Sequence, residues 1–353
     1  MELFENELYQ EDVQTVASLS LPWDFLKNRS ILISGAGGLI GSFLVDVIMQ
    51  RNHNSRMNCR VFALGRNEEK AHKRFAYCID DNNFQFISHD INQPLEVDGF
   101  EQGGYVLHLA SNTPPLAYTT DPIGAVTTNI IGTHNLLRFS TEKNAKRFVF
   151  ASSNEIYGEN RGNVEFFDEK YCGYIDSNTM RAGYPESKRC GEALCQAYIR
   201  QEGLEVVIPR FTRSYGPTML MSDTKAISQF IRKGIAGENI VLKSEGTQYY
   251  SYTYVADAVS GLLTVLLCGN SGEAYNIADQ PGDIMLKNLA AIIADQAGTN
   301  VVYELPDDVE KKGYSTATKA RLDGSKLKKL GWSMKYDVEA GVKRTLHILK
   351  SMG

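Results

Sequence analysis

The segment from 29 to 51 constrains the fold more than any other part of the chain. It reads RSILISGAGGLIGSFLVDVIMQR, which is an apolar run, a turn with Gly35, Gly38 and Gly41, and an apolar helical stretch. Glycine allows the positive φ and the close backbone approach that such a turn needs. The N–H groups at the start of the following helix can bind phosphate groups. Strand, glycine turn and helix in this order predict a dinucleotide-binding unit, and a tight turn without a ligand is the alternative.

Five further apolar runs predict strands along the first 212 residues. They read CRVFALGRN (59–67), FQFISHDIN (84–92), YVLHLAS (105–111), KRFVFASS (146–153) and LEVVIPRFT (204–212). Helical segments separate most of them, and 122–144 is the clearest. Strands that alternate with helices predict an α/β fold with a doubly wound parallel sheet of the Rossmann type.

The pattern divides the chain into three parts. We expect an N-terminal helical extension over 1–27 and the dinucleotide-binding domain over 28–208, with later returns to it at about 235–275. From 209 to 353, loops alternate with short helices, and a charged amphipathic helix ends the chain. This part is predicted to be mainly a smaller α/β substrate-binding region.

Composition excludes several classes of function. The 353 residues are 43% hydrophobic and 22% charged, which is ordinary for a globular protein. A net charge of -5 argues against nucleic-acid and membrane-surface partners. No apolar stretch reaches the length of a membrane span, and the acidic N-terminus does not resemble a secretion signal. Six cysteines show neither CxxC spacing nor metal-ligand pairing with histidine, so we expect free thiols, no metal and a cytoplasmic location.

The second predicted strand carries information on the cofactor. NAD-binding folds usually place an acid at its end to hold the ribose hydroxyls, but this strand ends in Leu64-Gly65-Arg66-Asn67. Arg66 could pair with a 2′-phosphate, which favours NADP over NAD; a solvated surface arginine is the alternative. Asp90 and Ile91, after the third strand, would suit the adenine amino group.

Candidate catalytic residues follow the fifth predicted strand. Tyr184 and Lys188 are spaced i, i+4, so they share one face of a helix. We expect the lysine ammonium to lower the pKa of the phenol, which could then exchange a proton with a sugar hydroxyl during hydride transfer. Ser153, at the end of the fifth strand, can hydrogen-bond the same oxygen. Glu155 lies two residues further on, and its carboxylate is the feature that needs an explanation.

At these residues the chain resembles the extended short-chain dehydrogenase/reductase family of nucleotide-sugar epimerases, dehydratases and decarboxylases. The resemblance covers nearly the whole chain from about residue 28. Its motifs are GAGGLIG, HLAS, TNIIGTHNLL, ASSNEIYG, YPESK, SYGP and YTYVADAV. Within the family, the segments 108–118, 171–189 and 197–210 are most similar to the UDP-glucuronate decarboxylases. The resemblance implies a homodimer and a nucleotide-sugar substrate.

The resemblance also implies roles for individual residues. Ser153, Glu155, Tyr184 and Lys188 would be catalytic, and Glu155 matches an acid that simple 4-epimerases lack. The implied cofactor contacts, besides Tyr184 and Lys188, are Gly35, Gly38, Leu39, Ile40, Gly41, Arg66, Asp90, Ile91, Leu109, Ala110 and Ser111. The implied substrate contacts are Tyr118, Asn154, Arg181, Arg210, Arg213, Tyr250 and Arg321.

Three positions depart from the decarboxylase pattern. Arg66 follows the second strand where those enzymes carry an acid. Tyr250 stands where the arginine of their GxQxRxxxYVxD motif would be, and Arg213 replaces the asparagine before YGP. Relative to that pattern, an arginine is absent at Tyr250 and present at Arg213, which changes where an anion can bind. UDP-glucuronate is therefore not assumed as the substrate.

Three hypotheses remain open from the sequence. In the favoured one, transient oxidation forms a keto sugar, and Glu155 assists loss of water or carbon dioxide or an epimerisation. In the second, NADPH reduces a keto sugar once, and Arg66 and Tyr250 favour this reaction. The third is a non-catalytic NAD(P)-binding protein. Arg210 and Arg213 are the best candidates for diphosphate contacts, with a structural ion pair as the alternative, whereas His108 is expected to be a core histidine.

Overall fold

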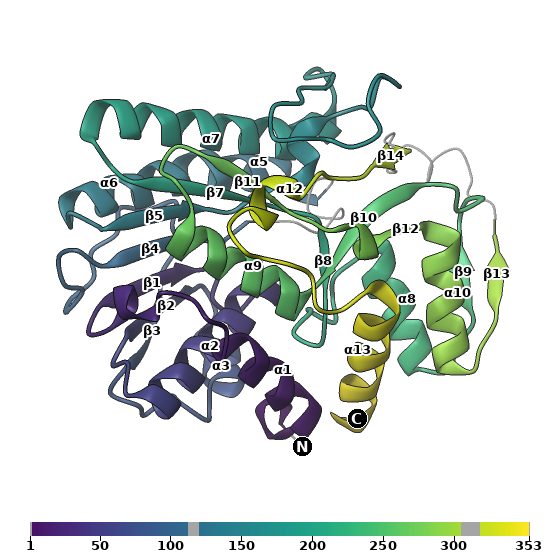
Figure 1. Ribbon diagram of the computed structural model, residues 1–353, viewed down its shortest axis with the longest axis horizontal. Coiled ribbons are helices and arrows are strands. Elements are labelled where there is room, and N and C mark those ends of the chain that lie inside the picture. The colour runs from purple at the N-terminus through teal and green to yellow at the C-terminus, as the bar shows by residue number, and fades with distance from the viewer. Residues whose placement is uncertain (1, 112–119, 305–317, 353) are drawn as a thin grey trace.

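The centre of the molecule is a parallel sheet (Figure 1). The computed structural model describes residues 2–111, 120–304 and 318–352. The strand order is β11-β7-β5-β4-β1-β2-β3, with β6 beside β7, which confirms the predicted doubly wound α/β fold. The bounds are β1 Ser30–Ser34, β2 Arg60–Gly65, β3 Phe84–Ser88, β4 Tyr105–His108, β5 Arg147–Phe150, β6 Ser152–Ser153, β7 Val206–Phe211 and β11 Ala274–Ile277.

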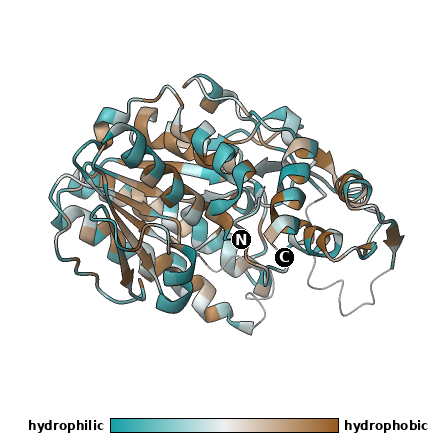
Figure 2. Ribbon diagram, turned by 90° about the horizontal axis from the view of Figure 1, so that it is seen from below, coloured by the Kyte–Doolittle hydropathy of each residue, from teal (hydrophilic) through white to brown (hydrophobic). Residues whose placement is uncertain are grey.

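Helices cover both faces of this sheet (Figure 1). One face carries α5 (Pro122–Thr127), a π-helical turn (Thr128–Gly132), α6 (Thr133–Glu142) and α7 (Gly183–Glu202). The other carries α2 (Leu39–Ser55) and α9 (Val255–Cys268), and α3 (Glu68–Arg74) follows β2. All five residues of β1 are buried, as expected for a strand covered on both faces. Figure 2 shows the strands as mostly hydrophobic, with hydrophilic residues gathered on the outer helices.

A second, smaller α/β region begins at the carboxyl end of β7. One residue after β7, β8 (Arg213–Tyr215) pairs with β10 (Tyr249–Tyr254), which also pairs with β12 (Asp283–Met285) and β14 (Lys319–Ala320). A further pair joins β9 (Ile240–Leu242) to β13 (Val301–Tyr303). The helices here are α8 (Ala226–Ile235), α10 (Leu286–Ala297) and α13 (Val338–Met352). The chain crosses back to the large sheet through α9, β11 and α12 (Ser325–Lys328).

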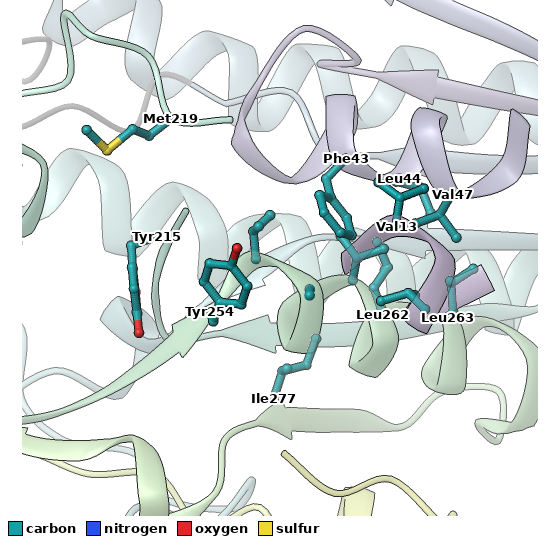
Figure 3. Close-up of a cluster of buried hydrophobic side chains, with 14 of the residues drawn as sticks. Val13, Phe43, Leu44, Val47, Tyr215, Met219, Tyr254, Leu262, Leu263 and Ile277 are labelled. Atoms are coloured by element: carbon teal, nitrogen blue, oxygen red, sulfur yellow. The ribbon is translucent and has the colours of Figure 1, made fainter. Parts of the chain in front are cut away.

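Helix α1 (Glu7–Ala17) and two short 3-10 turns, Leu3–Glu5 and Trp23–Leu26, precede the first strand. α1 packs on α2 and α9 and also contacts α13 (Figure 1). Figure 3 shows the shared apolar cluster, to which α1, α2 and α9 contribute Val13, Phe43, Leu44, Val47, Leu262 and Leu263. The N-terminal helix is therefore part of the core of the molecule. Within the described residues, no helix combines the length and apolarity required to cross a bilayer.

Candidate active site

The glycine turn has the geometry that a dinucleotide needs. Gly35 has a φ of +72°, and a Cβ there would lie 2.7 Å from the backbone of Ala110. A Cβ on Gly41 would lie 2.3 Å from the Gly35 carbonyl oxygen, so helix and strand meet without space for a side chain. Gly38 is the N-cap of α2, whose first turn contains Leu39 and Ile40. The turn and the helix N-terminus thus fit a pyrophosphate.

The other predicted cofactor residues lie along the same edge of the sheet. Arg66 is exposed just after β2, and its neighbour Asn67 caps α3. Asp90 follows β3 and is exposed, whereas Ile91 is buried. The remaining residues, which come directly after β4, are Leu109, Ala110 and Ser111. Because the strands are parallel, their carboxyl ends share one edge, and these residues could line a single groove.

Tyr184 lies at the centre of a cluster of hydroxyls. It is buried near the start of α7, and the hydroxyls of Ser153 and Ser111 are within hydrogen-bonding reach of its phenol. Lys188 lies one helical turn on, with its Nζ 5.9 Å from the centre of the Tyr184 ring and 2.8 Å from the Ala151 carbonyl oxygen, to which it donates. The structure therefore brings together Ser153, Tyr184 and Lys188, as the sequence predicted.

Asn129 belongs to this cluster but was not recognised in the sequence. It is fully buried in the π-helical turn, a kind of helix irregularity that often occurs at functional sites. Its Oδ1 accepts from Ser111 at 2.8 Å, and its Nδ2 donates to Ser187 at 2.9 Å. Asn129 therefore links the end of β4 to the helix that carries Tyr184. The signal for it was an asparagine within TNIIG, an otherwise apolar helical stretch.

Burial dominates the electrostatics of the catalytic pair. It raises the pKa of Tyr184 to about 12, although hydrogen bonding with Ser153 and Ser111 lowers it. Burial also lowers the pKa of Lys188 to about 7. The expectation that the lysine would lower the pKa of the phenol is therefore wrong for this structure, because desolvation disfavours both charged groups.

Glu155 lies beside the hydroxyl cluster. It belongs to a 3-10 turn, Asn154–Tyr157, that directly follows β6, and its backbone N–H donates to Ser153 Oγ at 3.2 Å. Its carboxylate accepts from Arg181 Nη2 at 3.0 and 3.2 Å, and both side chains are partly exposed. The negative charge of Glu155 is one of the causes that raise the pKa of Tyr184.

The predicted substrate residues fall into different environments. Asn154 is buried in the same turn as Glu155. Arg321 pairs with Glu165 at 2.8 Å. Arg213 places its guanidinium over the Tyr250 ring, 3.6 Å from the ring centre. Tyr118 lies outside the described residues.

Arg210 requires a correction. Its guanidinium donates to both carboxylate oxygens of Glu192, at 2.9 and 2.6 Å, and also to Tyr157 Oη and the Glu169 carbonyl oxygen. It is the structural ion pair that was the alternative to a diphosphate contact. His108 is likewise a core residue, because its ring nitrogens lie 2.9 Å from Ser34 Oγ and 3.0 Å from Thr133 Oγ1.

Comparison with known proteins confirms the resemblance noted in the sequence. Residues 31–278 match the family described as NAD dependent epimerase/dehydratase. UDP-glucuronic acid decarboxylase 1 of Xenopus tropicalis is 31% identical over 93% of this chain and 75% of its own length. UDP-glucuronic acid decarboxylase 3 of Arabidopsis thaliana is 33% identical over 89% and 87%, respectively.

A solved structure supports the same fold. UDP-glucuronic acid 4-epimerase from Bacillus cereus, in complex with UDP-glucuronic acid and NAD, superposes with a TM-score of 0.76. It is 22% identical, and the match covers 92% of this chain and 100% of that one. The prediction of an NAD(P)-dependent enzyme of the nucleotide-sugar type is confirmed at the level of the family. The chain belongs to the NAD dependent epimerase/dehydratase family, the extended short-chain dehydrogenases/reductases.

Proposed function

We propose that the protein transiently oxidises a hydroxyl of a nucleotide-activated sugar and uses the resulting ketone to drive a second reaction at a neighbouring carbon. The relatives named as UDP-glucuronic acid decarboxylases support loss of carbon dioxide as that second reaction. Dehydration and epimerisation are the other reactions open to such a ketone. Hydride then returns to the sugar, so that the cofactor ends each turnover in its starting oxidation state.

The observation that carries this proposal is Glu155, whose backbone N–H donates to Ser153 Oγ and whose negative charge acts on the pKa of Tyr184. A bound nicotinamide supplies the hydride acceptor and donor. Tyr184 takes the proton of the sugar hydroxyl and later returns it. Ser153, which interacts with the Tyr184 phenol, hydrogen-bonds the same sugar oxygen and so orients it. Glu155 serves as acid or base in the second reaction, once the substrate has displaced it from Arg181. A site that performed only hydride transfer would not need this fourth group.

We infer that the cofactor is NAD or NADP, held by the glycine turn and the α2 N-terminus. The exposed Arg66, where an acid would hold the ribose hydroxyls of NAD, supports NADP. Lys188 lies on the same helix face as Tyr184, which supports the proposal that it contacts the cofactor.

The test is a cofactor measurement on purified protein supplied with UDP-glucuronic acid. The proposal expects the dinucleotide to copurify and to persist through many turnovers, with a product that has lost carbon dioxide. Tyr184→Phe should abolish turnover and keep the cofactor, because the ring is preserved. Stoichiometric consumption of NADPH with a keto sugar would instead support the net reductase, the second candidate that Arg66 and Tyr250 favour.

We also propose a homodimer in the cytoplasm, in a pathway that supplies activated sugars for polysaccharide biosynthesis. An open, largely apolar cavity of about 620 Å³ lies between α5 and the start of α7. Ile123, Ile131 and Met180, on or beside these elements, are exposed. An apolar surface of this kind supports association. Light scattering of the purified protein would decide between monomer and dimer.

A further inference from the structure

Arg213 is a cation for which the described residues provide no acidic partner. Its Nη1 is buried and has no hydrogen-bond partner within the described part of the chain, where no carboxylate is in ion-pairing distance either. The Tyr250 ring, 3.6 Å away, stacks against the guanidinium. A stacked ring holds a guanidinium in place without using its N–H groups.

The other arginines predicted for the substrate differ in this respect. Arg181 pairs with Glu155, Arg210 with Glu192 and Arg321 with Glu165. Burying a charge without a partner is unfavourable, so a buried arginine usually pairs with an anion of the protein or of a ligand. Arg213 is the one member of this set, among the described residues, that lacks its anion.

The position of Arg213 connects it to the catalytic cluster. Ser153 pairs with Phe211 across β6 and β7, and Arg213 follows Phe211 by two residues on the same edge of the sheet. Two residues of extended chain span roughly 7 Å. Arg213 and Ser153 are therefore close along the ends of neighbouring strands, at the same edge of the sheet.

We propose that Arg213, held flat against Tyr250, is the receptor for an oxyanion of the substrate, a phosphate or a carboxylate. The proposal deepens the proposed function and rests on it. The decarboxylase pattern has an uncharged asparagine on the strand that corresponds to β8 and an arginine on the one that corresponds to β10. In this chain the arginine, Arg213, is on β8, and the uncharged residue, Tyr250, is on β10. The planar fork of a guanidinium binds the two oxygens of either group together, which a lysine in its place would not do.

The first test measures the affinities of NAD-saturated protein for UDP, UDP-glucose and UDP-glucuronic acid by calorimetry. In Arg213→Gln, loss of a charge-assisted contact should weaken binding by about tenfold or more. The control Lys319→Gln removes an exposed charge from the same small sheet and should change no affinity. An equal loss for all three probes identifies a phosphate as the partner of Arg213, and a loss confined to UDP-glucuronic acid identifies the carboxylate. Unchanged affinities in Arg213→Gln would overturn the proposal.

The second test restores the pattern of the relatives. Tyr250→Arg alone places two guanidinium groups side by side, and Arg213→Asn alone leaves no cation. Each single variant should weaken binding, and the double variant should recover most of the lost affinity because the cation is again present once. Losses that simply add in the double variant would contradict an exchange of positions.

A third measurement separates this inference from the proposed function. Pyrophosphate or glucuronate should raise the melting temperature of NAD-saturated wild type but not of Arg213→Gln. If no nucleotide sugar binds, the proposed function fails, yet this comparison still decides the role of Arg213. Equal stabilisation of both proteins, or of neither, would show that Arg213 is a structural residue.

Discussion

The Lys188 ammonium makes the stability of the protein depend on pH. Burial lowers its pKa from 10.5 to about 7, so between these values the unfolded chain binds a proton that the folded protein does not. The free energy of unfolding should therefore rise as the pH increases from 7 towards 10. Relative to Lys188→Met, wild type should gain on the order of 2 to 3 kcal/mol between pH 7 and 9.5 in urea unfolding. A difference between the two proteins that stays constant with pH would contradict this assignment.

Arg66 is expected to select the cofactor. In Arg66→Gln, the affinity for NADP should fall by about tenfold, because a charge-assisted contact to the 2′-phosphate is lost, while that for NAD should change little. Lys70→Gln, on the exposed side of α3, is a matched control for the loss of one positive charge. Fluorescence titration of both dinucleotides measures the change. If the affinities for NADP and NAD fall equally, Arg66 does not bind the 2′-phosphate of NADP.

At the scale of elements, the buried carboxylate of Asp12 on α1 contacts side chains of β10 and α13. Asp12 is fully buried, accepts from Tyr254 Oη at 2.6 Å and lies 2.8 Å from Arg344 Nε. Glu11 is largely exposed and contacts the same arginine. The two acids differ in burial but share a partner.

Asp12→Ala should lower the free energy of unfolding by about 1 to 3 kcal/mol, because it leaves the buried Tyr254 hydroxyl without its acceptor and leaves Arg344 with only the exposed Glu11 as its anion. Glu11→Gln should cost less than about 1 kcal/mol, since an exposed ion pair contributes little. Chemical denaturation at pH 7 compares both variants with wild type. Equal effects would mean that burial of Asp12 does not matter and that α1 is held by its apolar side alone.

Elements that depend on local sequence were predictable. The five apolar runs and the glycine turn specify strands, a positive φ and a helix start without reference to distant residues. The partners of charged side chains were not predictable, because Arg210 meets Glu192 on α7 and Arg181 meets Glu155 only through the fold. The pKa of Tyr184 was misjudged for the same reason: the spacing to Lys188 is local, but the burial of both groups is not. Asn129 was missed because a single polar residue in a helix does not reveal that it faces an active site.

At the scale of the molecule, the site lies where the large sheet meets the smaller region. The large sheet supplies the glycine turn, Ser153 and Glu155, and the crossover through β8 and β10 brings Arg213 and Tyr250 to the same edge. Arg66 is the departure from the decarboxylase pattern on the cofactor side, whereas Arg213 and Tyr250 are the departures on the substrate side. The chemistry of the proposed reaction therefore rests on Glu155, and its substrate choice rests on the smaller region.

The most direct test of the central claim is Glu155→Gln, followed with UDP-glucuronic acid. The isosteric amide keeps the shape of the site but removes the acid–base group. We expect the oxidation to continue, seen as absorbance of reduced nicotinamide on the protein, while release of carbon dioxide falls by about 10²-fold or more. Unchanged rate and product in Glu155→Gln would contradict the account, because Glu155 would then have no part in the second reaction.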